Sequence, residues 1–286
     1  MAVKILIDSA SDYTQAEAQE RGIHLIPMLI TFGESEYFDG IDITTEEFYH
    51  KLTTSPEFPK TSQINPFRYK EKFKKLTSVG DEVICITMSS KLSGTYASAC
   101  LAAQDFEGQV YVVDSYTATV GERMLCEYAI TLVKKGLSAK EIVDELNKVK
   151  YRIIVTGIVD ILKYLQKGGR ISKVAALAGE MLSVKPIPMV IDGEIIAVGK
   201  VIGSKKAHRF LNTVVEKKGI DFDMPHCLLW TGNSDEKLKS YVEDSKKVWG
   251  DKITSMPSFL VGPTIGTHLG PNCAGLAFFT KEESNQ

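Results

Sequence analysis

Three short segments of the chain combine side-chain hydroxyls with backbone N–H groups. They are Thr61-Ser62-Gln63, the segment 89–95 (SSKLSGT) and the segment 262–268 (GPTIGTH). The second and third each follow an apolar run typical of a strand, and the second opens a helix of small residues. Hydroxyls and free N–H groups are neutral donors that can hold an anion. Because no second histidine, reactive-looking cysteine or metal-ligand cluster lies near them in sequence, we expect these segments to bind a ligand rather than to cleave one.

Ser93 and Gly94 stand at the start of the small-residue helix. Ser93 suits the N-cap position, so its hydroxyl could serve the helix alone. Gly94 would let a ligand approach the backbone closely, and the first turn of a helix has free N–H groups. In a parallel α/β sheet such loops lie at the carboxyl ends of the strands, where ligands bind. Capping and ligand binding therefore both stay open for Ser93.

Thr61 and Ser62 lie between Pro59 and Pro66, in a stretch that cannot be a regular helix. This spacing predicts a polar loop, which either caps the helix after Pro66 or contacts a ligand.

Thr267 and His268 belong to a run, 266–271, that is denser in glycine and proline than a plain turn needs. A lone histidine is more often structural than functional. Here the run predicts a backbone with special torsions, so a functional role for His268 is equally open.

Acidic residues follow two of the expected strands: Asp8 and Asp12 follow the first, and Asp114 a later one. Such residues could bind a metal or act as a phosphatase nucleophile. However, Asp12 also suits the N-cap of the next helix, and Asp8 can accept hydrogen bonds within its own turn. We therefore favour structural roles for them.

The segment 167–172 (KGGRIS) is a basic glycine turn between two expected helices. It lacks the spacing of a P-loop and follows a helix rather than a strand. We favour a helix C-cap at Gly168 over a phosphate site.

The composition is that of an ordinary water-soluble globular protein. The 286 residues include 44% hydrophobic and 24% charged residues, and the formal net charge is −2, which gives no reason to expect nucleic-acid binding. No apolar stretch approaches the roughly 18 residues of a membrane-spanning helix, and the first residues enter a strand at once, so we expect no signal peptide. The five cysteines are widely spaced and form no C-x-x-C pair. Buried free thiols and a cytoplasmic location are expected.

Residues 1–150 are expected to form an α/β domain with a mainly parallel sheet. Apolar strands alternate with helical patterns, which is typical of a parallel sheet covered on both faces. The expected strands are Val3–Ile7, Ile23–Pro27, Glu82–Thr87 and Gln109–Val113. The expected helices are Tyr13–Arg21, Thr45–Leu52, Pro66–Ser78, Ser93–Ala103 and Thr119–Lys135. Leu29–Phe32 and Ser35–Phe38 flank Gly33-Glu34 as a small hairpin.

Residues 151–286 are expected to form a second α/β domain with a mixed or antiparallel sheet. Asp192-Gly193 is the strongest short hairpin signal in the chain. The expected strands are Arg152–Val159, Lys185–Ile191, Glu194–Gly199, His226–Trp230, Lys252–Pro257 and Gly275–Phe279. The expected helices are Ala139–Val149, which leads into this domain, Ile161–Gln166, Lys173–Leu182, Lys206–Lys217 and Asp235–Val248.

Taken together, these segments resemble the DegV family of bacterial fatty-acid-binding proteins. The resemblance runs over nearly the whole chain, from Ile7-Asp8-Ser9 to the final apolar strand, and is carried by the order and spacing of several short motifs. Its most specific parts are Thr61-Ser62-Gln63, Ser93-Gly94-Thr95-Tyr96, the basic turn 167–172, Lys185-Pro186 and Ile265-Gly266-Thr267-His268.

The resemblance implies a two-domain α/β protein with one long-chain fatty acid, such as palmitate or oleate, buried between the domains. It implies that the carboxylate is held by Thr61, Ser62, Ser93 and Gly94, with Thr267 and His268 nearby. It also implies a carrier without turnover, metal or cofactor, which presents the carboxylate to a separate ATP-dependent kinase. Transient membrane contact during ligand exchange would fit this role.

Two departures from the family pattern concern the partner and the pocket rim. Relatives often carry arginine two positions after the lysine that matches Lys200, whereas this chain has Ile202. That arginine lies in a region implicated in kinase contact. Lys200, Lys205 and Lys206 stay available as docking residues. The segment 269–273 (LGPNC) also departs from the family pattern, and a changed rim could alter acyl-chain preference.

Two other classes compete with a carrier. A hydrolase or phosphatase could use Ser93 or Asp8 as nucleophile, although Ser93 is not in G-x-S-x-G and Asp8 lacks a second aspartate two residues on. A nucleotide-binding regulator is a further alternative, but no G-x-G-x-x-G follows a strand.

For a carrier, burial of about 14 methylenes at ~0.8 kcal/mol each supplies about 11 kcal/mol gross, so neutral donors need only orient the head group.

Overall fold

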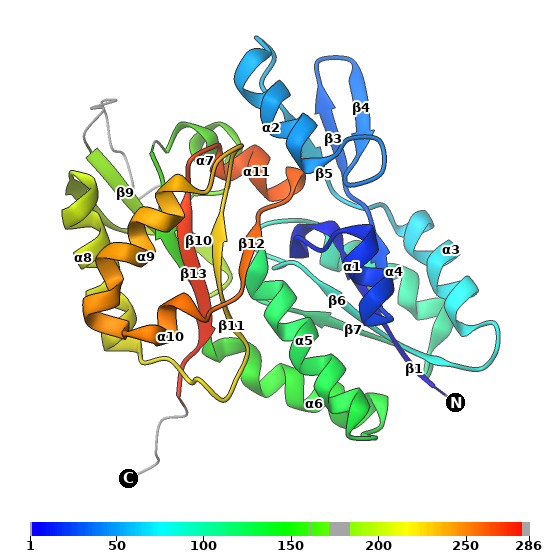
Figure 1. Cartoon of the computed structure of the whole chain (residues 1–286). Coiled ribbons are helices and arrows are strands. Elements are labelled where there is room, and N and C mark those ends of the chain that lie inside the picture. The colour runs from blue at the N-terminus through cyan, green and yellow to red at the C-terminus, as the bar shows by residue number, and fades with distance from the viewer. Residues whose placement is uncertain (1, 161, 172–183, 282–286) are drawn as a thin grey trace.

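The computed structural model describes residues 2–160, 162–171 and 184–281. The helix expected at Lys173–Leu182 lies outside these residues. The described residues form two large sheets, one on each side of the molecule, and a small third sheet at one end (Figure 1). The chain is an α/β protein, as predicted.

The first large sheet has four parallel strands in the order β2-β1-β6-β7. They are β1 (Val3–Asp8), β2 (His24–Ile26), β6 (Glu82–Thr87) and β7 (Val110–Asp114). The helices around this sheet are α1 (Gln15–Arg21), α3 (Pro66–Thr77), α4 (Thr95–Ala103), α5 (Val120–Lys134) and α6 (Ala139–Val149). The predicted parallel sheet is confirmed, because both faces of its apolar strands are buried under helices.

The small sheet has three antiparallel strands in the order β4-β3-β5, next to helix α2 (Thr45–Thr54). The hairpin of β3 (Leu29–Phe32) and β4 (Ser35–Phe38) is as predicted. The expectation of a loop at Thr61 and Ser62 is wrong, since they lie in β5 (Lys60–Ser62) and pair with β3. A run of three polar residues has no hydrophobic alternation that would predict a strand. It becomes a strand here because it pairs with β3.

The second large sheet is mixed, with the strand order β10-β9-β8-β13-β11-β12. Its strands are β8 (Ile153–Ile158), β9 (Val184–Ile191), β10 (Glu194–Ile202), β11 (His226–Trp230), β12 (Ser258–Leu260) and β13 (Ala274–Phe279). Neighbours are antiparallel except β11 and β12, so the predicted mixed sheet is confirmed. Asp192 and Gly193 have φ values of 50° and 80° and join β9 to β10 in the predicted hairpin.

The helices of the second half are α7 (Lys163–Lys167), α8 (Ser204–Lys218), α9 (Glu236–Trp249), α10 (Asp251–Thr254) and α11 (Pro263–Leu269). The strand expected at Lys252–Pro257 is wrong: the chain forms α10 there and becomes a strand only after Pro257. The turn expected at 262–268 is also wrong, and the special torsions expected over 266–271 occur at Gly270 alone, which has a φ of 73°. Pro263 begins a helix, where its missing N–H is no loss, and Gly266 continues it.

Helix α5 lies between the two large sheets, because it packs against β1 on one side and β8, β11 and β13 on the other (Figure 1). Helices α8 and α9 cover the outer face of the six-stranded sheet and close a second apolar core. The inner face of that sheet therefore looks toward the first half of the chain.

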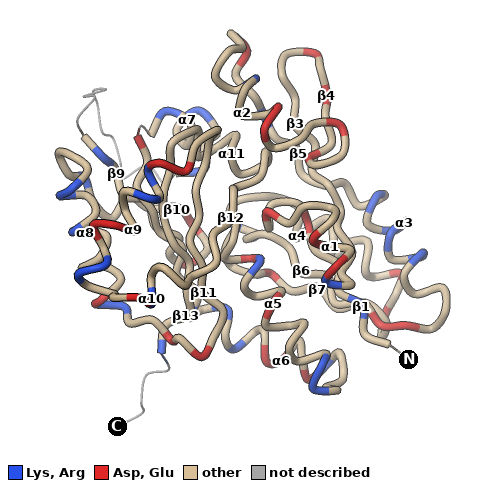
Figure 2. The backbone as a smooth tube through the Cα atoms, viewed as in Figure 1, with Lys and Arg blue, Asp and Glu red and all other residues tan. Residues whose placement is uncertain are grey.

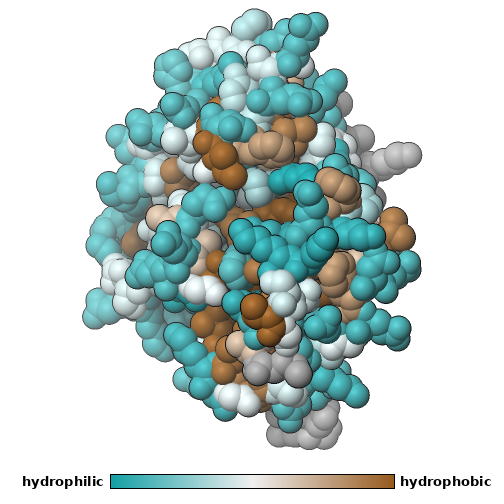
Figure 3. Space-filling model, turned by 90° about the vertical axis from the view of Figure 1, so that its right-hand side faces the viewer, coloured by the Kyte–Doolittle hydropathy of each residue, from teal (hydrophilic) through white to brown (hydrophobic). Residues whose placement is uncertain are grey.

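Charged residues of both signs lie mainly on the outer helices and loops (Figure 2). On the face drawn in Figure 3, apolar residues lie in separate small groups among hydrophilic ones, as on ordinary water-exposed protein surface. Among the described residues, none of the helices has the length and apolar character needed to cross a membrane.

Candidate functional site

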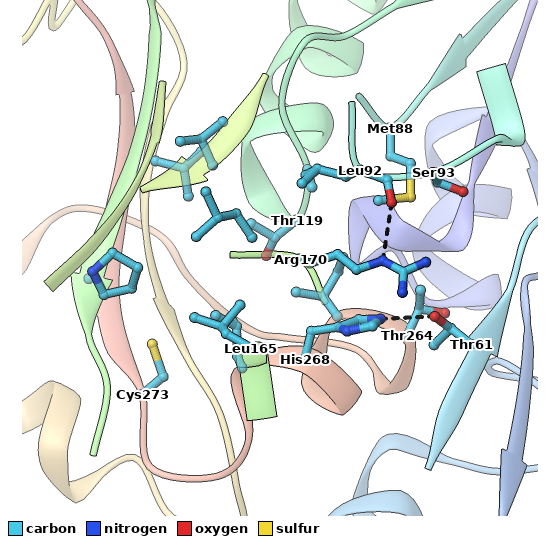
Figure 4. A pocket seen from close by; sticks show the side chains of 18 of the residues that line it. Thr61, Met88, Leu92, Ser93, Thr119, Leu165, Arg170, Thr264, His268 and Cys273 are labelled. Carbon is cyan, nitrogen blue, oxygen red and sulfur yellow. Dashed lines mark hydrogen bonds between the residues drawn. The ribbon is translucent and has the colours of Figure 1, made fainter. Parts of the chain in front are cut away.

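A cavity enclosing about 940 Å³ of space, part of it open to solvent, lies between the inner face of the six-stranded sheet and the loops of the first half (Figure 4). Most of its wall is apolar. Met28, Met88 and Leu92 contribute from the first half, and Val155, Leu165 and Met189 from the second.

One end of the cavity is polar. Thr61, Ser93, Arg170 and His268 line this end, and in Figure 4 the Arg170 side chain lies between Ser93 and the Thr61–His268 pair. Cys273 lies at the opposite side of the cavity in the same view. The four polar residues come from four separate elements, so the fold alone brings them together.

Ser93 and Gly94 stand at the mouth of the cavity, before helix α4. Of the two roles left open for Ser93, the N-cap position is excluded, because Gly94 occupies it. The Ser93 hydroxyl instead lies 2.9 Å from Oγ1 of Thr95 and accepts a hydrogen bond from the Thr95 N–H. A β-carbon at Gly94 would lie 1.9 Å from Oε1 of Gln63, so the glycine lets the Gln63 side chain lie against the helix start.

His268 projects from α11, and its Nε2 lies 2.9 Å from Oγ1 of Thr61 on β5. Burial, with a smaller contribution from the charge of Arg170, lowers the pKa of His268 to about 4. The ring is therefore neutral near pH 7. Its Nδ1 is buried and has no hydrogen-bond partner among the described residues, and a β-carbon at Gly168 would lie 2.1 Å from it. Gly168 thus allows α7 to pack directly on the imidazole.

Arg170 places a positive charge on the cavity wall. Its Nε donates to the Leu92 carbonyl at 3.3 Å, and its Nη1 donates to the Gly168 carbonyl. The predicted C-cap of α7 at Gly168 is confirmed. Arg170 was not predicted to lie at this site, although the basic character of the turn 167–172 is a usable signal. The polar end therefore contains a cation as well as neutral donors.

Two further residues named from the sequence lie outside the cavity wall. Ser62 is exposed on β5, where strand alternation turns it away from the side on which Thr61 lies. Thr267 is fully buried, and its hydroxyl donates to the Pro263 carbonyl one turn earlier in α11. In contrast, Thr119 and Thr264 line the cavity, although neither was predicted as a binding residue.

The residues named for docking are all exposed. Lys200 lies near the end of β10, and Lys205 and Lys206 lie in the first turn of α8. Ile202 lies between them and is 62% exposed.

The acidic residues near the first strand have structural partners. Asp8 accepts hydrogen bonds from the backbone N–H groups of Ala10 and Met88 at 2.9 and 3.0 Å, as predicted for its own turn. Burial raises the pKa of Asp8 to about 6. The expected N-cap role of Asp12 is wrong, because Thr14 caps α1 in a capping box. Within the described ranges, no group of three or more His, Cys, Asp or Glu side chains could hold a metal ion.

The model of the DegV family matches residues 2–281 of this chain. The chain belongs to the DegV family. Among curated DegV domain-containing proteins, one from Caldanaerobacter subterraneus subsp. tengcongensis is 35% identical over 280 residues, covering 98% of this chain and 99% of the relative. One from Clostridium perfringens is 32% identical over 287 residues, covering 98% and 99%.

Solved structures of DegV proteins share the fold of this chain. A Thermus thermophilus DegV family protein described by its fatty acid binding has a TM-score of 0.87 at 28% identity, covering 98% of this chain and 100% of the other. The DegV of Bacillus subtilis, described as a fatty acid binding protein, has a TM-score of 0.80 at 27% identity, with the same coverage. The two-part α/β architecture implied by the resemblance is confirmed by these DegV structures.

The low pKa of His268 predicts a pH-dependent stability for the lipid-free protein. Because the folded pKa of about 4 is below the unfolded value of 6.5, the unfolded chain binds more protons as pH falls from about 6.5 to about 4, and stability is lost in that window. Between pH 7 and pH 5, the free energy of unfolding should fall by roughly 2 kcal/mol more in the wild type than in His268→Gln.

Urea unfolding at the two pH values measures this difference. The raised pKa values of Asp8 and Asp39 act in the opposite direction but equally in both variants. His50→Gln, at an exposed histidine of α2, is the matched control and should behave as the wild type. An equal fall in wild type and His268→Gln would contradict the prediction.

Proposed function

We propose that this DegV protein binds one long-chain fatty acid in the cavity, with the carboxylate at the polar end and the tail along the apolar wall. The observation that carries the proposal is the cavity itself, which has one polar end and otherwise mostly apolar walls between two halves of the chain. Relatives of the same fold are described as fatty acid binding proteins.

The chemistry of the two ends fits such a ligand. Burial of about 14 methylenes contributes about 11 kcal/mol gross, which supplies the affinity. At the polar end, the hydroxyls of Thr61 and Ser93 donate to the carboxylate, and the Arg170 guanidinium balances its charge. The neutral His268 supports this set through its contact with Thr61.

We further propose that the protein is a carrier without its own turnover, which hands the carboxylate to a separate ATP-dependent kinase. Ser93 and Gly94 are only half-buried, so a carboxylate beside them can be approached from outside. The exposed Lys200, Lys205 and Lys206 are the proposed docking residues. A cytoplasmic location, and transient membrane contact during ligand exchange, complete this proposal.

We also propose a domain boundary near residue 150. The strands of the four-stranded and three-stranded sheets end at or before Asp114, whereas those of the six-stranded sheet begin at Ile153.

The geometry favours a carrier over a hydrolase. Nε2 of His268 contacts Thr61, and the hydrogen-bond partner of the Ser93 hydroxyl is Thr95, so Ser93 and His268 do not form a nucleophile–base pair. Asp8 is fully buried, is bonded to the backbone N–H groups of Ala10 and Met88, and is not itself one of the residues that line the cavity.

Lipid extraction under denaturing conditions, followed by mass spectrometry, tests the binding proposal. Protein purified from cells should release about one long-chain fatty acid per chain. Protein that carries no lipid and takes up neither palmitate nor oleate would refute it.

The carrier proposal is tested by adding ATP and magnesium to loaded protein with and without a fatty acid kinase. Acyl phosphate should form only with the kinase, and its formation by the protein alone would overturn the proposal.

Ser93→Ala should weaken fatty acid binding by about tenfold, because a hydrogen bond to a charged group contributes about 1.5–3 kcal/mol. Stability should change by less than about 1 kcal/mol, since Ser93 does not occupy the N-cap position and the loss at the start of α4 is one hydrogen bond, from the Thr95 N–H. Equilibrium competition against a fluorescent fatty acid measures the affinity. Ser90→Ala, at an exposed serine of the same loop, is the control. Unchanged affinity with a lower melting temperature would show that Ser93 serves the fold alone.

A further inference from the structure

Two aspartates from the first half of the chain hold the start of helix α11, which belongs to the second half. The Gly262 N–H donates to Oδ1 of Asp12 at 2.8 Å, and the Thr264 N–H donates to Oδ2 of Asp39 at 3.1 Å. The Thr264 hydroxyl donates to the same Asp39 oxygen. The N-cap residue of α11 is Gly262, which has no side chain to cap the helix. Carboxyl oxygens of Asp12 and Asp39 therefore supply the acceptors that this helix start lacks, and Asp39 also supplies negative charge there at neutral pH.

Both aspartates are buried: Asp12 is 6% exposed and Asp39 is 4% exposed. Burial raises the pKa of Asp12 to about 8 and that of Asp39 to about 6. Burying two carboxyl groups costs folding free energy unless their hydrogen bonds offset the lost hydration. Their hydrogen bonds to Gly262 and Thr264 therefore stabilise the buried positions of the two side chains.

The contacts of the two aspartates continue to the cavity wall. Oδ2 of Asp12 accepts from the hydroxyl of Thr119, and Thr119 and Thr264 both line the cavity. The Ser9 hydroxyl lies 3.3 Å from that of Thr264 and accepts from the N–H of Met28, another wall residue. The far end of α11 is tied to the first half as well, through His268 and Thr61.

We infer that Asp39, assisted by Asp12, is a positioning residue that fixes α11 and thereby aims His268 at Thr61 in the polar end of the cavity. This inference rests on the proposed function. Without the Asp39 contact, the start of α11 loses its acceptor, the helix shifts and the His268–Thr61 contact loosens. The bound acid then leaves faster.

Other contacts keep α11 near its place and make the test feasible. The Tyr49 hydroxyl donates to the Val261 carbonyl at 2.9 Å, and a β-carbon at Gly266 would lie within 3 Å of the Phe48 and Tyr49 rings. These apolar contacts with α2 hold the fold when Asp39 is changed. We therefore expect Asp39→Asn to disturb the orientation of His268 rather than the folding of the protein.

The test compares Asp39→Asn with Asp8→Asn. Asp8 is equally buried and also has a raised pKa, but its bonds to Ala10 and Met88 stay within the first half. In Asp39→Asn, transfer of palmitate from the loaded protein to albumin should be about tenfold faster, the change expected for loss of a charged hydrogen bond. The melting temperature of the lipid-free protein should stay near that of the wild type. Asp8→Asn should release palmitate at the wild-type rate.

A second measurement reports the orientation of the His268 side chain in the absence of lipid. The imidazole NMR signals of His268 in the lipid-free protein should shift in Asp39→Asn and stay in place in Asp8→Asn. Thr264→Val, which keeps Asp39 but removes one donor to it, should give a smaller shift in the same direction. Unchanged His268 signals in Asp39→Asn would overturn the inference, even if the protein proved to bind no fatty acid. Equal acceleration of palmitate release in Asp39→Asn and Asp8→Asn would also overturn it, whereas a wild type without any fatty acid affinity would refute the proposed function instead.

Discussion

Arg170→Met should lower the affinity for a long-chain fatty acid by about 10- to 100-fold while the fold persists. The guanidinium is a cation of the polar end that can pair with a carboxylate, and a hydrogen bond between charged groups is worth about 1.5–3 kcal/mol. Methionine keeps an unbranched apolar stem of similar reach, so the packing against Leu92 is largely retained. Competition binding with fatty acids of defined length measures the loss.

The matched control is Lys91→Met, which removes an exposed cation from the loop that also carries Ser93. It lowers the net charge by the same amount without changing the cavity wall. If Arg170→Met and Lys91→Met weakened binding equally, long-range charge rather than contact with the head group would explain the effect.

Gly275→Ala should destabilise the protein by at least about 3 kcal/mol. In the centre of the six-stranded sheet, Gly275 on β13 pairs with Gly157 on β8. A β-carbon at Gly275 would lie 2.3 Å from the Thr156 carbonyl oxygen and 2.7 Å from the Cα of Gly157. Both atoms belong to backbone that the sheet holds in place, so the two strands must separate.

Urea unfolding measures this loss, and Gly94→Ala is the comparison. A β-carbon at Gly94 would also lie very close to another atom, but that atom is the end of the flexible Gln63 side chain, which can move away. Its cost should stay below about 1 kcal/mol. Similar losses in the two variants would show that the β8–β13 spacing is not fixed by the two glycines.

The elements that local sequence specifies were predicted well. The apolar strands of the parallel sheet and the Asp192-Gly193 hairpin follow from burial pattern and turn chemistry, which act over a few residues. Residues 262–268 were harder to predict, because the glycine within this helix is explained by its close packing against Phe48 and Tyr49, which are far away in sequence. Likewise, Thr61 becomes part of a strand only through pairing with β3.

The candidate site was predicted in part for the same reason. Local motifs were enough to predict four of the residues that the structure places on the cavity wall: Thr61, Ser93, Gly94 and His268. Arg170 sits in a turn whose local pattern suits a helix C-cap, and its position at the polar end arises only when α7 packs against α11. Motif spacing carries no information about such a contact.

The strand order of the six-stranded sheet also governs when the cavity can come into being during synthesis. Strand β13 follows every other strand of this sheet in sequence, yet it occupies an interior position between β8 and β11. The edge strands on both sides are made earlier and cannot be joined until residues 274–279 have emerged. His268 and Cys273 are also translated shortly before this strand. A nascent chain that stops short of β13 thus lacks a central strand of the sheet whose inner face forms one side of the cavity.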